Sequence, residues 1–269
     1  MEHFLDNVTQ AKVNYKSYIK QFEQLLKERS FLNTTLEAIE RGFIFWPLNR
    51  GYDSFLDFRA SIGIARIVNK CGTSSQVSKE EFAYYLEYML NILQIPKYCQ
   101  DQMIYDTNER AILSVLYRVL DEIDCDIINT PQGQKVVFKN GMIEVAKEIT
   151  QDEYNLDKDL YLFTHSSNKK NLIAKADILC RIYKYLETIA PKAKSYGYSN
   201  LWDDIGKLMD GLDIRHAPNK KEKEILNGMK KSEMLDWYDQ LFGMSLSLII
   251  LTDYSSKRRD VKELKGRLG

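Results

Sequence analysis

Residues that break regular structure are scarce in this sequence, which has 13 glycines and five prolines among 269 residues. All-β folds need frequent turns, and turns are built largely from glycine and proline, so the scarcity favours long helices. Apolar residues also recur at helical spacing through most of the chain. We therefore expect a mainly α protein, a multi-helix globular bundle. The prolines are expected between the helical segments, where a missing amide hydrogen costs least: Pro47, Pro96, Pro131, Pro191 and Pro218.

The same spacing sets bounds for the individual helices. Ser78 and Glu81 form a capping-box pattern, and Asp53 is the expected N-cap of an earlier helix. The stretch 241–251 is apolar nearly all round, so the last helix is expected to be central and buried. The expected helices cover residues 3–29, 33–41, 54–70, 78–94, 169–189 and 232–255, with one more from Thr107 or Asn108 to Ile123 and another from Ser199 or Asn200 to Asp210.

One segment breaks the helical pattern. Segments 135–138 and 142–145, which contain β-branched residues, flank the sequence Lys-Asn-Gly at 139–141, and Asn-Gly between two such runs is typical of a tight hairpin turn. We expect one small β-hairpin near residues 135–145. An isolated hairpin is only marginally stable, so it is expected to lie on the helices.

The same segment is the expected boundary within the chain. Residues 131–150 are predicted to connect an N-terminal helical region, 1–130, with a C-terminal helical region, 151–269, and the alternative is one single domain. Lys+Arg and Asp+Glu balance at 38 each. This balance argues against a protein that coats nucleic acid with its whole surface, which needs an excess of positive charge.

Histidines and cysteines are too few for the commonest metal sites. The chain has three histidines and four cysteines, and no two cysteines form a CxxC pair, so we expect no metal, no cofactor and no disulfide partner. Free thiols, the absence of a signal-peptide pattern at the start and the lack of a long apolar stretch favour a cytoplasmic protein without a membrane partner. The motifs GxxxxGK[ST], GxGxxG, HExxH and GxSxG are absent.

Arg215 and His216 lie where a helix is expected to end, and they form the first candidate site. A fixed cation beside a titratable base suits phosphodiester chemistry, because arginine can hold a phosphate while histidine moves a proton. Asp213 completes this candidate catalytic set. The alternative is structural: the two cations cap the carbonyl end of the helix and pair with Asp210 or Asp213.

These residues resemble the motif of HEPN domains, in which an arginine and a polar residue are followed by a histidine a few positions later. Arg215 and His216 match the first two positions, but the terminal histidine is missing, since Lys220, Lys221 and Glu222 stand in that part of the motif. The resemblance implies an all-helical, often homodimeric protein of a defence or toxin system. Many members of this family are metal-independent ribonucleases.

Two further groups of residues are candidates for binding rather than catalysis. Trp46, Arg50 and Arg59 lie near an aromatic segment, and aromatic rings next to arginines can stack bases or anchor a partner. The alternative is an ordinary core plug between helices. Near the end of the chain, the basic residues Lys257, Arg258 and Arg259 form either a solvated terminus or a weak phosphate-attracting patch.

Three functional hypotheses follow from these patterns. The leading one is a non-catalytic, HEPN-like helical module of a defence or toxin-regulation system that binds RNA or a protein partner. The second is a metal-independent ribonuclease that uses Arg215 to grip phosphate and His216 as the base. The third is a helical protein-interaction scaffold whose contact surface lies within residues 43–59.

Overall fold

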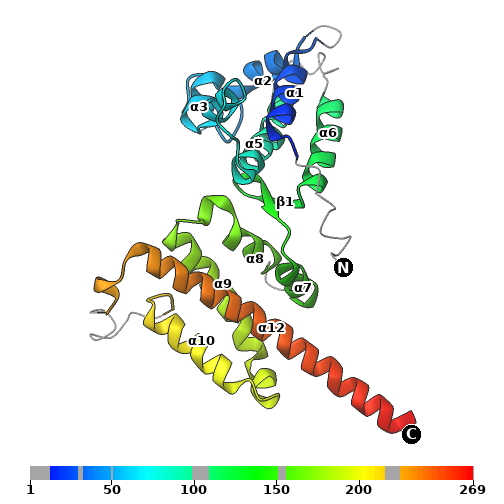
Figure 1. The fold of residues 1–269 in the computed structure, drawn as a ribbon, viewed down its shortest axis with the longest axis vertical. Helices are drawn as coiled ribbons and strands as arrows, with labels where there is room; N and C mark the ends of the chain where they lie inside the picture. The colour runs from blue at the N-terminus through cyan, green and yellow to red at the C-terminus, as the bar shows by residue number, and fades with distance from the viewer. Residues whose placement is uncertain are drawn as a thin grey trace, which may run out of the picture. The chain divides into compact units, whose positions relative to one another are not determined.

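The computed structural model describes residues 13–29, 33–49, 51–98, 109–150, 156–215 and 225–268. The expectation of a mainly α protein is confirmed, since the described residues form helices and one antiparallel pair of strands (Figure 1). The chain divides into two compact units, residues 1–137 and residues 138–269. Among the described helices, none is both long enough and apolar enough to cross a membrane.

Unit 1 is built around one helix that is buried on most of its surface. This helix, α5 (Lys79–Ile92), packs against α1, α4 and α6. The expected capping box is confirmed, because the Ser78 hydroxyl accepts from the amide of Glu81 while the Glu81 carboxylate accepts from the amide of Ser78. The remaining elements are α1 (Tyr15–Lys27), α2 (Thr35–Phe43), α3 (Phe55–Ser61), α4 (Ile64–Lys70), the 3-10 helix η2 (Ile95–Tyr98), α6 (Glu109–Glu122), β1 (Cys125–Thr130) and β2 (Gly133–Phe138).

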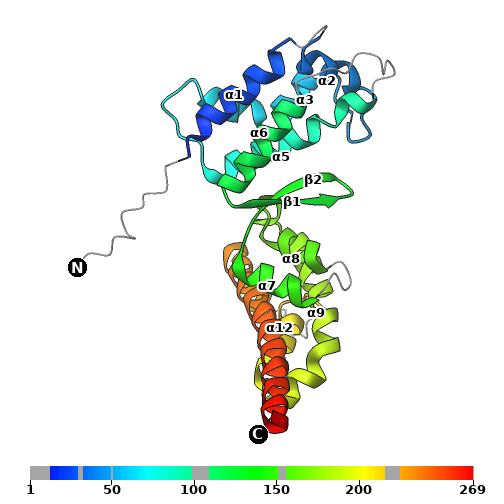
Figure 2. The same ribbon diagram turned by 90° about the vertical axis from the view of Figure 1, so that its right-hand side faces the viewer.

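The hairpin exists but lies earlier in the chain than residues 135–145. Its strands β1 and β2 flank a turn at Pro131 and Gln132 (Figure 2). Gly133 follows this turn with φ of 109°, a conformation that glycine adopts without strain. Asn140 is no hairpin residue, because its side chain accepts hydrogen bonds from the next helix, at 3.0 Å from the amide of Met142. The Asn-Gly sequence therefore starts a helix here instead of turning a strand.

Two of the expected helices in unit 1 differ from the structure by more than two residues. Residues 1–12 lie outside the described part, and α1 begins at Tyr15 because the Asn14 side chain caps it, so a continuous helix from residue 3 is wrong. The expected helix 54–70 is two helices, α3 and α4, which are separated at Gly63 with φ of 78°. Ser54 caps the first of them in place of Asp53.

Unit 2 is a helical bundle in which one long helix contacts three others. This helix, α12 (Lys231–Leu268), packs against α9, α7 and α10, and α8 packs against α9 and α7. The expected apolar stretch is buried at residues such as Leu241, Leu248 and Ile249. The other elements are α7 (Gly141–Thr150), α8 (Leu156–Thr164), the 3-10 helix η5 (Ser166–Asn168), α9 (Leu172–Ser195) and α10 (Ser199–Gly211).

Three expectations for unit 2 are corrected by the structure. Pro191 lies inside α9 instead of between helices, although proline removes a helical hydrogen bond there. Helix α10 begins after Tyr198 without a side-chain cap. The last helix continues from 255 to Leu268, so the basic end of the chain is helical. Cys71, Cys125 and Cys180 are free thiols, as expected, and Cys99 lies outside the described residues.

Candidate functional site

Arg215 lies just beyond the end of α10 and is held from three directions. Its Nε and Nη2 donate to the two carboxylate oxygens of Asp210, each at 2.8 Å. Its Nη1 donates to the Tyr183 hydroxyl at 2.8 Å and lies 3.6 Å from a carboxylate oxygen of Glu187. The bond to Asp210 raises the pKa of Arg215 further above its ordinary value. Arg215 therefore pairs with Asp210, as the structural alternative predicted.

The backbone around Arg215 forms a defined helix ending. Asp213 adopts a left-handed conformation with φ of 56°, which aspartate tolerates better than most residues. The amide of Ile214 donates to the carbonyl of Met209 at 3.0 Å, and the amide of Asp213 donates to the carbonyl of Asp210 at 3.2 Å. This is the Schellman pattern of helix termination. Asp213 therefore has a structural role: it is the left-handed residue that ends helix α10.

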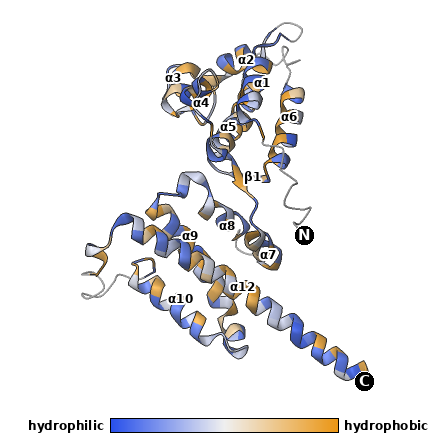
Figure 3. Ribbon diagram, viewed as in Figure 1, coloured by the Kyte–Doolittle hydropathy of each residue, from blue (hydrophilic) through white to orange (hydrophobic). Residues whose placement is uncertain are grey.

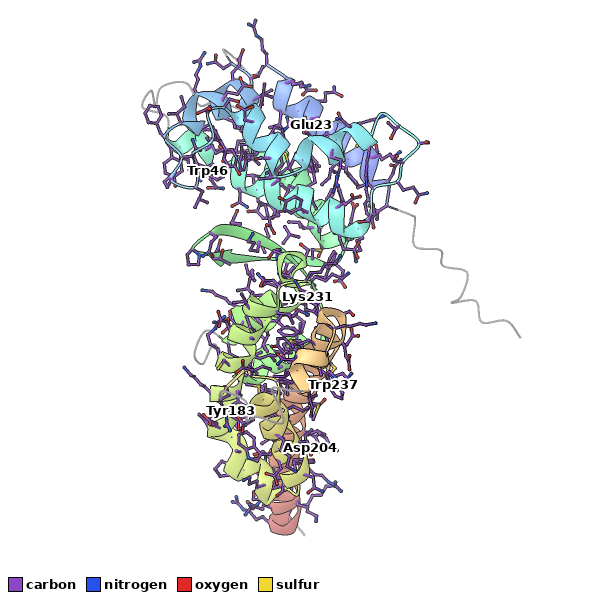
Figure 4. The ribbon with its side chains drawn as sticks, turned by 90° about the vertical axis from the view of Figure 1, so that its left-hand side faces the viewer. Glu23, Trp46, Tyr183, Asp204, Lys231 and Trp237 are labelled. Carbon is purple, nitrogen blue, oxygen red and sulfur yellow. The ribbon has the colours of Figure 1, made fainter. Side chains whose placement is uncertain are left out.

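The guanidinium of Arg215 also belongs to a stack of rings. It lies 4.7 Å from the centroid of the Tyr183 ring, which stacks on Trp202 at 5.2 Å with an angle of 21° between the ring planes. Burial raises the pKa of Tyr183, and the positive charge of Arg215 opposes this rise. Figure 4 labels Tyr183 in unit 2, and the stack connects α9 to α10.

These contacts limit what Arg215 offers to a ligand. A phosphate that approached its fork would compete with the bidentate bond to Asp210 and would be repelled by the same carboxylate. His216 lies outside the described residues, so the Arg215–His216 pair has no described geometry. The catalytic role of these residues stays a prediction.

The aromatic candidate divides into residues with different surroundings. Trp46 is buried and lines a cavity in unit 1, where Figure 4 labels it. Arg59 is turned into the core: its Nη2 donates to Glu23 at 2.6 Å, and its side chain is 12% exposed. The guanidinium lies 5.6 Å from the centroid of the Tyr88 ring. Arg50 lies outside the described residues. The structure does not bring Arg59 to the surface as a binding arginine.

The basic candidate at the end of the chain is the most exposed of the three. Every residue from 257 to 268 is exposed, and all of them belong to α12. Lys257 pairs with Asp253 one turn earlier at 2.8 Å, and this bond raises the pKa of Lys257. Arg259 lies 3.3 Å from Glu263. The cation of each pair is exposed, so both pairs are weak. Figure 3 shows this end of α12 as mostly hydrophilic.

Sequence reasoning missed a polar connection between α5 and the hairpin. The Asn91 side chain accepts from the amide of Gln134 at 2.9 Å and donates to the carbonyl of Gln134 at 2.8 Å. Glu87, one turn earlier, accepts from Nζ of Lys135 at 2.7 Å and from the amide of Val136 at 3.1 Å. The available signal was a glutamate within the mostly apolar sequence of α5, since a buried carboxylate needs a partner.

The sequence matches no family model and no curated protein, and the structure matches no solved structure. Within the described ranges, no group of three or more His, Cys, Asp or Glu side chains is placed to hold a metal ion.

Proposed function

We propose that this protein is a non-catalytic, HEPN-like helical module that binds RNA through the exposed end of α12. The supporting observation is the continuous helical segment 257–268, in which every residue is exposed. It holds six basic residues against two acidic ones, which makes it locally positive although the whole chain has no net charge. The setting in defence or toxin regulation rests on the HEPN resemblance.

The charges of this segment suit a polyanion. Its twelve residues extend over about 18 Å, given the rise of an α-helix. Arg258, Lys262, Lys265 and Arg267 form no ion pair within the described part of the chain. Tyr254, one turn before the segment, is 59% exposed, and an exposed tyrosine ring can stack on a base. The segment thus offers cations without a described ion pair, next to a side chain that can stack.

The contacts of Arg215 support a non-catalytic function. A ribonuclease of the HEPN type would need a free arginine fork, whereas the fork here is occupied by Asp210 and Tyr183. The motif also lacks its terminal histidine. Binding then depends on the exposed charges and needs no catalytic group.

The test is the binding of a fluorescein-labelled single-stranded RNA, measured by anisotropy at increasing KCl concentration. Replacement of Arg258, Lys262, Lys265 and Arg267 by glutamine should abolish most of the binding. If these four cations each neutralise one phosphate, the logarithm of the affinity falls with the logarithm of salt with a slope of about −3. Between 50 and 200 mM salt the wild type then loses affinity roughly 50-fold.

A matched control distinguishes the effect of these four cations from the effect of a change in net charge. Lys169, Lys170, Lys184 and Lys207 are exposed in the same unit, and their replacement by glutamine changes the net charge by the same amount. This control should bind RNA nearly as the wild type does. Equal loss in both variants, or binding that salt does not weaken, contradicts the proposal.

A second candidate function, a helical interaction scaffold, has an observation of its own. Val261, Leu264 and Leu268 are 51%, 53% and 79% exposed, and their spacing places them on one side of α12. An apolar stripe on an exposed helix suits a partner helix. Replacement of Leu264 and Leu268 by serine tests this function. The double variant should bind a protein partner more weakly, whereas its salt-dependent affinity for RNA should stay unchanged.

A further inference from the structure

The last turns of α12 carry a stripe of exposed apolar side chains with a seven-residue repeat. Tyr254, Val261 and Leu268 are 59%, 51% and 79% exposed, and Leu264 between the last two is 53% exposed. These four residues are the α12 stripe. Apolar residues that recur every seven positions, with others between them, are typical of a helix that pairs with another helix in a coiled coil. In Figure 1 this end of α12 extends beyond the other helices of unit 2.

The α12 stripe lies on the side of the helix that faces away from the bundle. Thr252 is buried at 3% exposure, and Tyr254, two positions later, is turned from it by about 200°. Ser255, on the bundle side, hydrogen-bonds to the hydroxyl of Tyr198 at the start of α10 at 2.8 Å. Because Val261 and Leu268 follow Tyr254 at intervals of seven, they stay on the outer side. A second helix can therefore lie along the stripe opposite the bundle.

Charged residues of opposite sign flank the stripe on its two sides. If the positions of the repeat are lettered a to g with Tyr254 at a, the g positions hold Asp253 and Asp260, and the e positions hold Arg258 and Lys265. In a parallel pair of helices, each g residue faces the e residue of the following repeat in the other helix. Asp253 then faces Arg258 of a second copy, and Asp260 faces Lys265 of that copy. The flanks are thus complementary to the flanks of an identical helix.

The opposite orientation brings like charges together. In an antiparallel pair the e positions face e positions and the g positions face g positions. The cations Arg258 and Lys265 would then oppose cations of the second copy, and the aspartates would oppose aspartates. Such contacts are unfavourable. The charge pattern therefore favours a second copy of this chain in the parallel orientation.

Lys257 is a charged residue at a d position, between Tyr254 and Val261. Its amine pairs with Asp253 of the same helix at 2.8 Å. In a parallel pair it faces Lys257 of the second copy, and a single polar residue in the seam fixes the register at a cost in stability. The seam is also short. The contact is therefore expected to be a weak dimer that forms as the concentration rises.

We propose that α12 pairs with α12 of a second copy of this chain as a short parallel coiled coil over residues 250–268. The α12 stripe forms the seam, and the aspartates at g with the cations at e set direction and register. This inference rests on the second candidate function, the helical scaffold, and names its partner. Lys262 and Arg267 lie outside the seam and its flanking pairs, so RNA binding is compatible with the dimer.

Sedimentation velocity of the full chain without RNA tests the dimer. The average mass should rise from that of one chain toward that of two through the micromolar range. Leu264→Ser/Leu268→Ser should stay monomeric at the same concentrations. The matched control is Val145→Ser/Ile173→Ser, which replaces exposed apolar residues elsewhere in unit 2 and should dimerise as the wild type does. A monomeric wild type, or equal dimerisation of both double variants, overturns the proposal. The anisotropy test of RNA binding is unaffected by that outcome.

Charge reversal tests the orientation. In a parallel dimer Asp260→Lys faces Lys265, and Lys265→Asp faces Asp260, so each variant alone should dimerise about fivefold more weakly or worse. An equal mixture of the two variants should recover the wild-type affinity, because each reversed charge then faces its opposite. In an antiparallel dimer a single reversal only exchanges one like-charge contact for another. Unchanged affinity of the single variants therefore contradicts the parallel arrangement.

Disulfide cross-linking tests the register directly. Tyr254→Cys places two thiols opposite each other in the parallel seam, so mild oxidation should give a covalent dimer above the wild-type background on a non-reducing gel. Arg259→Cys is the control, because Arg259 is exposed on the side of α12 away from the seam and its thiols should stay apart. Equal cross-linking of the two variants, or none above background, contradicts the assigned register.

Discussion

At the scale of single residues, Arg215 illustrates which contacts the sequence can predict. Asp210 lies five positions earlier, near the same helix end, so its pairing with Arg215 was among the expected alternatives. Tyr183 lies on a different helix, 32 positions away, and nothing local indicates that its ring would stack against the guanidinium. The same holds for Glu87, whose partner Lys135 is 48 positions away. Buried charge predicts that a partner exists, but only the packing of elements decides which one.

The contacts of Arg215 predict a structural effect of its removal. Arg215→Ala should lower the free energy of unfolding by about 1–2 kcal/mol, because it removes a bidentate carboxylate pair and a contact with an aromatic face. Urea unfolding measures the change. Arg259→Ala is the control, since its pair with Glu263 is exposed, and it should change stability by less than about 0.5 kcal/mol.

The same variant decides between the non-catalytic protein and the ribonuclease. Expression of the wild type and of Arg215→Ala in a bacterial host should give equal growth if the protein does not cleave RNA. Toxicity of the wild type that Arg215→Ala relieves, at equal protein level, would support the ribonuclease and contradict the proposed function. Because the stability effect is expected to be modest, loss of folding would not explain such relief.

Glu81 predicts a pH dependence at the start of α5. Burial alone would raise its pKa, but the bonds from Lys70 and from the amide of Ser78 outweigh burial and leave the pKa below its ordinary value of 4.5. A carboxyl whose folded pKa is lowered stabilises the fold above its unfolded pKa, and this contribution is lost as pH falls through the folded pKa. Between pH 5 and pH 3 the wild type should therefore lose more stability than Glu81→Gln.

Urea unfolding at several pH values measures this difference. Glu233→Gln is a suitable control, because Glu233 is an exposed residue at the start of α12 and forms no described ion pair. Its stability should follow the wild type across the pH range. A Glu81→Gln variant that also follows the wild type would show that the capping carboxylate contributes nothing to acid sensitivity.

At the scale of elements, sequence patterns that are complete within a few residues predicted the structure better than patterns whose outcome depends on packing against other elements. The Ser78–Glu81 capping box is complete within four positions, and it is confirmed. Asn140-Gly141 has the sequence of a hairpin turn, but Asn is also a good N-cap, and the packing of unit 2 favours the helix. Pro191 was expected to lie between helices. Helix α9 continues through it, and contacts along α12 and α8 offset the lost hydrogen bond.

The hairpin turn depends on Gly133 for two reasons. Its φ of 109° strains any other residue, and a Cβ atom there would overlap Oδ1 of Asn91. Gly133→Ala should lower the free energy of unfolding by about 2 kcal/mol or more. Gly141→Ala, in α7 with open space around it, should leave stability unchanged or raise it by roughly 0.5 kcal/mol. Equal effects of the two substitutions would contradict this account of the turn.

At the scale of the whole molecule, the aromatic cavity that Trp46 lines and the proposed RNA-binding segment lie in different compact units. The aromatic cavity uses residues before Val137, and the basic segment lies in α12 of unit 2. The sequence predicts a boundary within residues 131–150, because the helical pattern stops around residue 131, and the two compact units divide after Val137. It did not reveal the cavity, since the side chains that form its walls come from segments up to 89 positions apart, from Trp46 to Lys135.

This division predicts that substitutions in the two units act independently. Gly133 lies in unit 1 and Arg215 in unit 2, and the two residues share no described contact. In the combined variant Gly133→Ala/Arg215→Ala, the loss in free energy of unfolding should therefore equal the sum of the separate losses within about 0.5 kcal/mol. Urea unfolding of the three variants measures this sum, and a larger departure would mean that a conformational change links the two units.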